Sequence, residues 1–360
     1  MKKDIPIRFI DAGTVSGLQS QTIYHALAYA KAPEDADTIV FSRPGSPYVC
    51  VGFHQDAKQE VDIAFCRQNG IPVIRRETGG GTVYIDEEQI FLQWIFQPDN
   101  LPRNIDARFQ LFVKPLIETW KYFGIDASIF PPNDVHVSGK KIAGTGAAAI
   151  GNAEVVTGNF LLGFDHGRMA QIIQSPDARF REMFRQSLEK YMTTAKEELN
   201  EVPTLESLKK VYFENCAAAL GRTVEPGGFT AIELDWMERL GEKLHADEWL
   251  FEYSKPSQPL RKLKVHAGVW LFQANLQTAG GIIQVALRTK GQRIDKIAFS
   301  GDFDFQPKYR LEGFEESLRN VALQEENIRE MVECFFELHG ASTPNVSTAD
   351  WTAAIMQCQS

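Results

Sequence analysis

Short, mostly apolar runs bounded by turn-forming residues fill about the first 165 positions of the chain and predict strands. These runs are 7–10, 38–41, 48–53, 71–74, 82–85, 90–96, 135–137, 141–143 and 155–164. The runs 82–85 and 90–96 flank an acidic turn and predict a β-hairpin. Gly158 is expected to interrupt the last run, because glycine weakens a strand interior.

Helical spacing is clearest at 106–123, where apolar side chains recur on one stripe. The stripe consists of Phe109, Phe112, Val113, Leu116, Ile117, Trp120 and Phe123. Gly124 is placed to end this helix, and Pro115 within it predicts a kink. Another helix is predicted at 20–30, and a helical section at 166–245, where charged residues and helix formers are enriched.

A change of composition near residue 255 predicts two domains. The chain has 360 residues, more than one hydrophobic core usually serves. The segment 253–259 contains two prolines and two serines and little that could pack, so we place the boundary there. Apolar runs beyond it predict a three-stranded meander at 265–278, 282–289 and 294–299. Two helices follow, so the prediction is a domain at 1–254 and a small α+β domain at 255–360.

Composition excludes several classes of function. The formal net charge is −9 and the sequence pI is about 5.4, whereas nucleic-acid-binding proteins usually show a basic face, so no nucleic acid partner is expected. No apolar stretch is long enough to span a membrane, and the N-terminal residues lack the apolar core of a signal peptide. Five cysteines without a C-x-x-C pair and seven scattered histidines argue against disulfides and a zinc site. We therefore expect a cytoplasmic protein.

The first candidate site is the segment 75–83, Arg-Arg-Glu-Thr-Gly-Gly-Gly-Thr-Val, between two predicted strands. Three consecutive glycines let backbone N–H groups approach a bulky anion, because no Cβ stands in the way. Arg75 and Arg76 carry guanidinium groups suited to phosphate or carboxylate oxygens. An Arg-Arg pair alone is usually a solvated face, and three glycines alone are usually a flexible loop. Their adjacency between strands favours a nucleotide or acyl-phosphate cradle.

The second candidate site is the segment 133–146 around a predicted hairpin. Asn133 and Asp134 offer hard oxygen ligands of the kind that Mg²⁺ prefers when it is shared with phosphates. Lys141 follows across the hairpin and is placed to bring an ammonium near the same phosphate. The alternative is a solvated hairpin tip, which this segment alone favours. A Rossmann-like G-x-G at 144–146 is rejected, because the preceding strand carries two lysines instead of an apolar run.

Together the two segments resemble the lipoate–protein ligase A family. The family pattern of Arg-Arg-x-Ser/Thr-Gly-Gly-Gly, Asn-Asp and Lys-Ile/Val-x-Gly stands here at 75–81, 133–134 and 141–144. Further parallels are Gly52-Phe-His-Gln55 with Glu60 and Asp62, Trp249 before the Pro-rich segment, and Gly301-Asp302-Phe303 after the meander. The six motifs stand in the family's order and cover most of the chain.

The resemblance implies a fold and a reaction. The fold is α+β, a mixed, largely antiparallel β-sheet with flanking helices, shared with biotin ligases, plus a small C-terminal accessory domain. In the implied reaction, the carboxylate of lipoate or octanoate attacks ATP with Mg²⁺ present and expels pyrophosphate. A lysine of a lipoyl carrier protein then attacks the acyl-adenylate and expels AMP. The implied carriers are lipoyl domains of 2-oxoacid dehydrogenases, the glycine cleavage H protein or a related carrier.

The resemblance also assigns the residues of the site. Lys141 is the expected catalytic residue, which stabilises charge on the α-phosphate and acyl oxygens. Arg76, together with Arg75, is expected to hold the acyl head or the phosphates. The other residues expected to bind ATP or substrate are Thr78, Gly79, Gly80, Gly81, Thr82, Val83, Asn133, Asp134, Gly144, Thr145, Gly146 and Gly158. Asp134 is the expected Mg²⁺ ligand.

Departures from the family leave alternatives open. Ile85 and Thr157 stand where many members have histidine, near the expected acyl pocket. An ATP-independent octanoyl- or lipoyl-transferase of the same fold is one alternative, but those most similar to this chain use a cysteine nucleophile, and none lies between Cys66 and Cys216. A non-catalytic scaffold that binds lipoyl carriers would explain the lost histidines but not the retained lysine and arginine. A biotin ligase is disfavoured, since its Gly-Arg-Gly-Arg loop is absent.

Overall fold

The computed structural model describes residues 5–131, 133–253 and 261–359. The chain divides into two compact units, the first formed by 1–174 and 188–255 and the second by 175–187 and 256–360. The predicted boundary between residues 254 and 255, and all of the Pro-rich segment except Tyr253, lie outside the described residues. That boundary therefore stays a prediction. A short piece from the middle of the chain, 175–187, belongs to the second unit.

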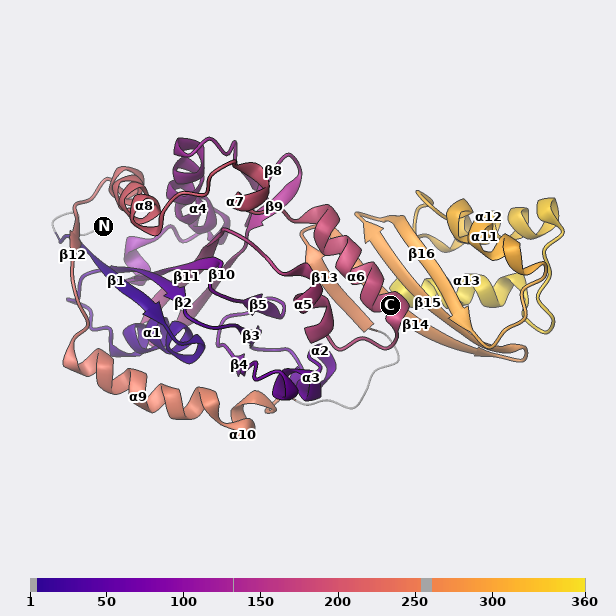
Figure 1. The fold of residues 1–360 in the computed structure, drawn as a ribbon, viewed down its shortest axis with the longest axis horizontal. Coiled ribbons are helices and arrows are strands. Elements are labelled where there is room, and N and C mark those ends of the chain that lie inside the picture. The colour runs from indigo at the N-terminus through magenta and orange to yellow at the C-terminus, as the bar shows by residue number, and fades with distance from the viewer. Residues whose placement is uncertain (1–4, 132, 254–260, 360) are drawn as a thin grey trace. The chain divides into compact units, whose positions relative to one another are not determined.

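A six-stranded mixed sheet forms the centre of the first unit (Figure 1). Its order is β10-β11-β6-β2-β1-β12, with β1 (Ile7–Val15), β2 (Thr38–Pro44), β6 (Gln89–Phe96), β10 (Thr145–Ile150), β11 (Ala153–Leu161) and β12 (Val224–Pro226). Strand β1 is parallel to β2 and β12, and the other pairs are antiparallel. The predicted interruption of β11 at Gly158 is wrong. The strand continues because the missing side chain makes room for Phe112, whose ring would lie 2.7 Å from a Cβ.

Two three-stranded sheets carry the candidate site. The first has the order β4-β3-β5, with β3 (Tyr48–Val51), β4 (Val73–Arg75) and β5 (Val83–Ile85). The second has the order β7-β8-β9, with β7 (Ser128–Phe130), β8 (Asp134–Val137) and β9 (Lys140–Ala143). The predicted hairpin of 82–85 with 90–96 is wrong, since β5 pairs with β3. Strand β6 lies inside the large sheet, where β2 and β11 occupy both of its edges.

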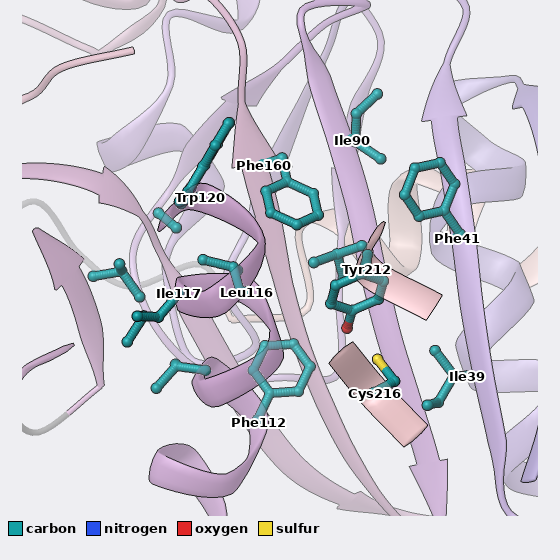
Figure 2. Close-up of a cluster of buried hydrophobic side chains, with 14 of the residues drawn as sticks. Ile39, Phe41, Ile90, Phe112, Leu116, Ile117, Trp120, Phe160, Tyr212 and Cys216 are labelled. Carbon is teal, nitrogen blue, oxygen red and sulfur yellow. The ribbon is translucent and has the colours of Figure 1, made fainter. Parts of the chain in front are cut away.

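Helices cover the sheets of the first unit (Figure 1). They are α1 (Gly17–Ala30), α2 (Ala57–Glu60), α3 (Ile63–Gln68), α4 (Ile105–Tyr122), α5 (His166–Ile172), α7 (Ala195–Glu198), α8 (Leu205–Leu220), α9 (Ala231–His245) and α10 (Asp247–Leu250), with a 3₁₀ turn η1 (Pro98–Asn100). The apolar stripe predicted for α4 is confirmed. Figure 2 shows Phe112, Leu116 and Trp120 facing Phe160 of β11 and Tyr212 of α8. The rings of Trp120 and Phe160 meet edge to face at 4.9 Å.

The second unit is an antiparallel sheet with helices packed against it. Its strands are β13 (Arg261–His266), β14 (Val269–Thr278), β15 (Gly281–Lys290) and β16 (Arg293–Gly301), and its helices are α11 (Leu311–Ser317), α12 (Glu325–His339) and α13 (Thr348–Met356), with 3₁₀ turns η2 (Lys308–Arg310) and η3 (Gln357–Gln359). The predicted strand 265–278 is in fact two strands, because Gly268, with φ of 78°, turns the chain between them. Helix α6 (Ala178–Tyr191) belongs to this unit as far as Ser187. The hydroxyl oxygen of Ser187 accepts a hydrogen bond from Arg288 at 2.9 Å.

These observations confirm the predicted fold class. Most strand pairs of the first unit are antiparallel, and helices flank its sheets. The second unit runs from strands to helices, as the α+β pattern predicted. Within the described residues, no helix combines the length and the apolar composition that crossing a bilayer requires.

Candidate functional site

The loop of residues 76–82, called the glycine loop below, joins β4 to β5. Its backbone turns at Gly80, which has a φ of 97°. The carbonyl oxygen of Gly80 lies so close to Gly52 that a Cβ there would be 2.0 Å away, so only glycine is tolerated at position 52. The Oε1 atom of Gln55 accepts from the N–H of Gly52 at 2.9 Å and from the hydroxyl of Thr82 at 3.0 Å. The loop is therefore seated on the end of β3 by upstream residues.

Arg76 braces the glycine loop from inside. Its Nη2 donates to the carbonyl oxygens of Gly79 and Gly81, both at 2.8 Å, and its Nη1 donates to that of Cys50 at 3.0 Å. The N–H groups of Gly79, Gly80 and Gly81 donate no hydrogen bond to any residue that the structure describes. A Cβ at Gly79 or Gly81 would meet nothing within 4 Å. Three neighbouring amides without an acceptor among the described residues could receive an anion, and the predicted cradle stays a prediction.

Arg75 is buried beneath this loop and is unavailable to a ligand. Its side chain has no exposed surface. The guanidinium donates to backbone carbonyls over 2.6–3.1 Å, those of Gly52, Phe53, Gln55, Trp249 and Leu250. The indole Nε1 of Trp249 donates back to the Arg75 carbonyl at 3.0 Å. The ligand-binding role expected for Arg75 is corrected accordingly, since its donors are consumed by the protein's own backbone.

His25 and Glu77 hold the start of the glycine loop. The N–H of Glu77 donates to Nε2 of His25 at 3.1 Å, and Nδ1 of His25 donates to the Gln21 carbonyl at 2.6 Å. This arrangement requires a neutral ring, and burial lowers the pKa of His25 to about 4. The Glu77 carboxylate accepts from the Tyr29 hydroxyl at 2.8 Å and from Lys243 Nζ at 2.9 Å. Sequence reasoning missed the role of Glu77, because nothing marks this residue except its place in the Arg-Arg-x-Thr pattern.

The other predicted residues of this segment divide between support and open surface. Thr78 is buried, and its carbonyl accepts from the N–H of Phe53 at 3.1 Å. Thr82 is also buried and is held by Gln55. Val83 is 40% exposed at the start of β5. The two threonines therefore support the loop, and Val83 offers apolar surface beside the free amides.

Asp134 and Lys141 form an ion pair across the β8–β9 hairpin. Their Oδ1 and Nζ atoms lie 2.9 Å apart, and the side chains are 5% and 23% exposed. The carbonyl of Lys141 accepts from the N–H of Thr193 at 2.9 Å, which anchors the strand backbone. A partly exposed lysine side chain is thus held in place by a buried carboxylate, a pairing that the sequence did not predict, and the phosphate-binding role of Lys141 stays a prediction.

Asn133, Gly144 and Thr145 lie in the same cluster as this ion pair. The amide of Asn133 donates to the Thr145 carbonyl at 3.1 Å, and the Thr145 hydroxyl donates to the Asn133 carbonyl at 2.6 Å. The Lys141 side chain lies over Gly144, where a Cβ would be 3.3 Å from Nζ. The structure therefore brings the polar members of the second segment together around Lys141.

Gly146 and Gly158 belong to the β10–β11 pair that continues from this cluster. Gly146 lies opposite Thr157, and Gly158 lies opposite Thr145. The G-x-G at 144–146 opens the strand β10 and not a helix, so the rejection of a Rossmann site is confirmed. Gly158 allows close packing, since a Cβ there would lie 2.7 Å from the Phe112 ring, whereas a Cβ at Gly146 would meet only the Thr157 hydroxyl oxygen at an ordinary 3.5 Å.

A chain of hydrogen bonds links the two clusters. The N–H of Gly144 donates to Asn159 Oδ1 at 3.1 Å, and Asn159 Nδ2 donates to Gln89 Oε1 at 3.1 Å. Gln89 Nε2 donates to the carbonyl of Tyr84 at 2.9 Å, within the strand that follows the glycine loop. Sequence reasoning missed Gln89 and Asn159, because each stands in an ordinary strand run without a motif around it. These three hydrogen bonds form a relay that runs from Gly144, next to the hairpin, to Tyr84 in the strand after the loop.

Asp134 supplies the carboxylate that a Mg²⁺ ion would use here. No group of three His, Cys, Asp or Glu side chains that could hold a metal occurs among the described residues. In nucleotide sites Mg²⁺ takes one or two carboxylates and completes its shell with phosphate oxygens and water. A single carboxylate therefore fits an ion that would arrive with a nucleotide, and the Mg²⁺ site at Asp134 stays a prediction.

The three cysteines of the first unit are buried. Cys50, Cys66 and Cys216 are each at most 1% exposed. Burial raises the pKa of all three thiols. Figure 2 shows Cys216 within the apolar core beside Tyr212. A thiol that is protonated and enclosed has no nucleophilic role.

A cavity of about 510 Å³ lies beside the ends of β5 and β11 in the first unit. Charged side chains dominate its lining, among them Asp86, Glu88, Asp165, Glu189 and Lys196. An alkyl chain binds best to a predominantly apolar lining. This cavity therefore does not identify the pocket for a medium-chain acid.

Comparisons with known proteins give the chain its relatives. Residues 19–217 match the family model described as the lipoyl protein ligase A/B catalytic domain, and residues 272–346 match that of the bacterial lipoate protein ligase C-terminus. The octanoyltransferase LipM of Geobacillus kaustophilus is 23% identical over 274 residues, which cover 68% of this chain and 98% of that protein. Lipoate–protein ligase 1 of Staphylococcus aureus is 25% identical over 260 residues, which cover 71% of this chain and 73% of that protein.

Solved structures share the fold. A bipartite lipoate protein ligase of Thermoplasma acidophilum, described with its E2 lipoyl domain, is 21% identical with a TM-score of 0.64, covering 70% of this chain and 99% of its own. A lipoate-protein ligase A bound with ATP is 19% identical with a TM-score of 0.60, covering 69% and 100%. LipL1 of P. falciparum in complex with lipoate is 14% identical with a TM-score of 0.55, covering 98% and 100%. These likenesses confirm the predicted fold.

Proposed function

Because the chain belongs to the lipoyl protein ligase A/B catalytic-domain family, we propose that it activates lipoate or octanoate as an acyl-adenylate at the expense of ATP and attaches the acyl group to a lysine of a lipoyl carrier protein. Relatives of the chain carry the names of both a ligase and an octanoyltransferase. The choice between these reactions rests on the chemistry of the site.

The observation that carries this proposal is the state of the cysteines in the first unit. A cysteine-dependent transferase needs a thiolate that reaches an acyl thioester. Cys50, Cys66 and Cys216 are enclosed and have raised pKa values. Lys141, by contrast, is partly exposed and stands beside a carboxylate. Free backbone amides and a fixed ammonium suit a reaction in which negative charge builds on phosphoryl oxygens.

The second unit supports the same choice. Residues 272–346 match a domain described as a lipoate protein ligase C-terminus. The LipM relative is almost fully covered by 68% of this chain, so much of the remainder has no counterpart in it. An accessory domain of the ligase type therefore accompanies the catalytic unit.

In the first step, the carboxylate of the acid attacks the α-phosphate of ATP and pyrophosphate leaves. The amides of 79–81 receive phosphate oxygens, and the Lys141 ammonium offsets the charge that develops at the α-phosphate. Asp134 holds Nζ in position before the substrate binds. Asp134 and Asn133 would also hold the Mg²⁺ ion that accompanies ATP, whose charge offsets that of the phosphates.

In the second step, the neutral amine of a carrier lysine attacks the acyl carbon and AMP leaves. Charge then builds on the acyl oxygen, and Lys141 is the cation assigned to it. The carriers proposed are lipoyl domains of 2-oxoacid dehydrogenases, the glycine cleavage H protein or a related protein. The lysine of such a carrier is the acceptor, so the carrier is a substrate as well as a partner.

A comparison of two acyl donors tests the proposal. The full chain is incubated with a lipoyl domain and either octanoate, ATP and Mg²⁺, or an octanoyl thioester of acyl carrier protein without ATP, and the carrier mass is measured. We expect modification with the first donor only, and the same yield in Cys50→Ala and Cys66→Ala variants. Modification from the thioester that disappears in either variant would establish the transferase reaction instead.

A further inference from the structure

Helices α9 and α10, residues 231–250, contact the glycine loop although they lie beyond the stretch 19–217 that matches the catalytic-domain family. Lys243 of α9 donates to Glu77 Oε1 at 2.9 Å, with side-chain exposures of 42% and 12%. The Lys243 ammonium also lies 4.0 Å from the centre of the Trp249 ring. One cation thus joins the loop to two points of the helical segment.

Trp249 forms the second point of attachment. Its Nε1 donates to the carbonyl of Arg75, and its own carbonyl accepts from Arg75 Nε at 3.1 Å. Its ring also lies 5.9 Å from that of Phe53, whose N–H donates to the carbonyl of Thr78 in the loop. Trp249 is therefore hydrogen-bonded directly to β4 at Arg75, and it reaches the loop through Phe53.

Tyr29 provides a third connection. Its hydroxyl donates to Glu77 Oε2 at 2.8 Å, and its ring stacks on Trp236 of α9 with centres 5.3 Å apart. Glu77 therefore receives one donor from α1 and one from α9, and its N–H donates to His25 of α1. The contacts of Tyr29, His25 and Lys243 therefore all meet at Glu77, which stands two positions before Gly79.

We propose that Lys243, Glu77 and Trp249 form a brace through which α9 and α10 position the glycine loop for its anionic ligand, and that Lys243 is a positioning residue. Three consecutive glycines lose more backbone freedom on ordering than other residues do. A loop that is already held before binding avoids part of that cost. The proposal rests on the proposed function only in taking ATP as the ligand.

Steady-state kinetics of two Lys243 variants and one control variant, all in the full chain, test the brace. Lys243→Met keeps the apolar stem over Trp249 but removes the cation. We expect its KM for ATP in acid-dependent pyrophosphate release to rise about fivefold, as the loss of a partly exposed ion pair implies, with kcat within about twofold. Lys243→Arg restores KM to within about twofold. Asp235→Asn, which breaks the exposed Asp235–Arg239 pair on the same helix, leaves both constants unchanged.

Hydrogen exchange supplies a readout that does not depend on activity. The amides of Arg76 and Glu77 are bonded to Val51 O and His25 Nε2. We expect the peptide covering 74–82 to exchange faster in Lys243→Met than in the wild type and in Asp235→Asn. Unchanged exchange, or a raised KM equally present in Asp235→Asn, would overturn the brace. Absence of pyrophosphate release by the wild type would contradict the proposed function and leave exchange to decide the brace.

Discussion

The glycine loop and the β8–β9 hairpin both carry cations, but the partners of those cations differ. Arg75 and Arg76 donate to backbone carbonyls, which include those of Gly79 and Gly81 in the loop itself. In the hairpin, the ammonium of Lys141 pairs with one carboxylate oxygen of Asp134, and the lysine side chain is 23% exposed. The two arginines therefore hold the backbone in and beneath the loop. The hairpin lysine, by contrast, is bonded to a side chain and is partly open to solvent.

This difference predicts that the two arginines contribute mainly to folding stability and that Lys141 contributes mainly to the reaction rate. A guanidinium that satisfies buried carbonyls cannot leave them without a large desolvation cost. An ammonium held at a partly exposed position exchanges a carboxylate for a phosphate oxygen more readily. Substitutions in the loop core should therefore lower the free energy of unfolding, and substitutions in the hairpin should lower the rate.

The largest expected effect is that of Arg75→Met on stability. The substitution removes the donors of five backbone carbonyls, two buried and three partly buried, and unsatisfied buried groups cost roughly 1–3 kcal/mol each. Since relaxation recovers part of this, we expect a loss of about 3–5 kcal/mol in the free energy of unfolding, measured with denaturant. Arg67→Met, whose side chain is 66% exposed, is the control and should change it by less than about 0.5 kcal/mol. Equal unfolding midpoints for both variants would contradict the structural role of Arg75.

Lys141→Ala should show the opposite behaviour. We expect the single-turnover rate of adenylation to fall on the order of 10²–10³-fold, because a fixed cation at the developing charge is lost. The unfolding midpoint should fall less than in Arg75→Met, since the lysine is partly exposed. Lys140→Ala changes the neighbouring lysine and should leave the rate within about threefold. An unaltered rate in Lys141→Ala would remove the residue from the mechanism.

His25 makes the stability of the loop depend on pH. Burial lowers its folded-state pKa to about 4, below the ordinary value of 6.5, and Glu77, Lys243 and Arg76 are the charged groups around it. The unfolded chain therefore binds the proton first as pH falls, and up to about 3 kcal/mol of stability is lost between pH 6.5 and 4. His25→Gln keeps an acceptor for the Glu77 N–H and should flatten the stability profile over that range. Identical profiles for wild type and variant would contradict the neutral buried ring.

Gly79→Ala should produce the smallest effect and a selective one. A Cβ at this position meets nothing within 4 Å in the protein, so the unfolding midpoint should not change. A phosphate resting on the loop amides would meet that methyl group, and we expect the KM for ATP to rise about tenfold. Gly228→Ala, also without neighbours within 4 Å, is the control outside the loop. No change in KM would show that the ligand does not approach Gly79.

Local patterns in the sequence predicted much of this molecule. The apolar stripe of α4 follows from spacing along one element, so no knowledge of the partners was needed. The helical section at 166–245 was predicted from its composition, and the structure interrupts it with the short strand β12. The glycine loop was singled out because three consecutive glycines follow an Arg-Arg pair between two predicted strands. The segment 133–146 alone favoured a solvated hairpin tip, and only the family resemblance singled out Lys141 and its neighbours.

Features set by distant parts of the chain could not be predicted. The structural role of Arg75 depends on the carbonyls of Trp249 and Leu250, far along the chain. The pairing of 82–85 with β3 depends on both edges of β6 being occupied, which no local pattern records. The assignment of 175–187 to the second unit is likewise a matter of tertiary packing. Gln89 and Asn159 form their hydrogen bond only when the separate strands β6 and β11 are brought together.

Pyrophosphate release without a carrier tests the central claim most directly. The chain is mixed with ATP and Mg²⁺, and lipoate and then octanoate are added in turn. We predict release that depends on the acid, with a large loss in Lys141→Ala and a much smaller one in Lys140→Ala. If neither acid gives release, and adding a lipoyl carrier domain does not restore it, the chain is not an adenylating ligase.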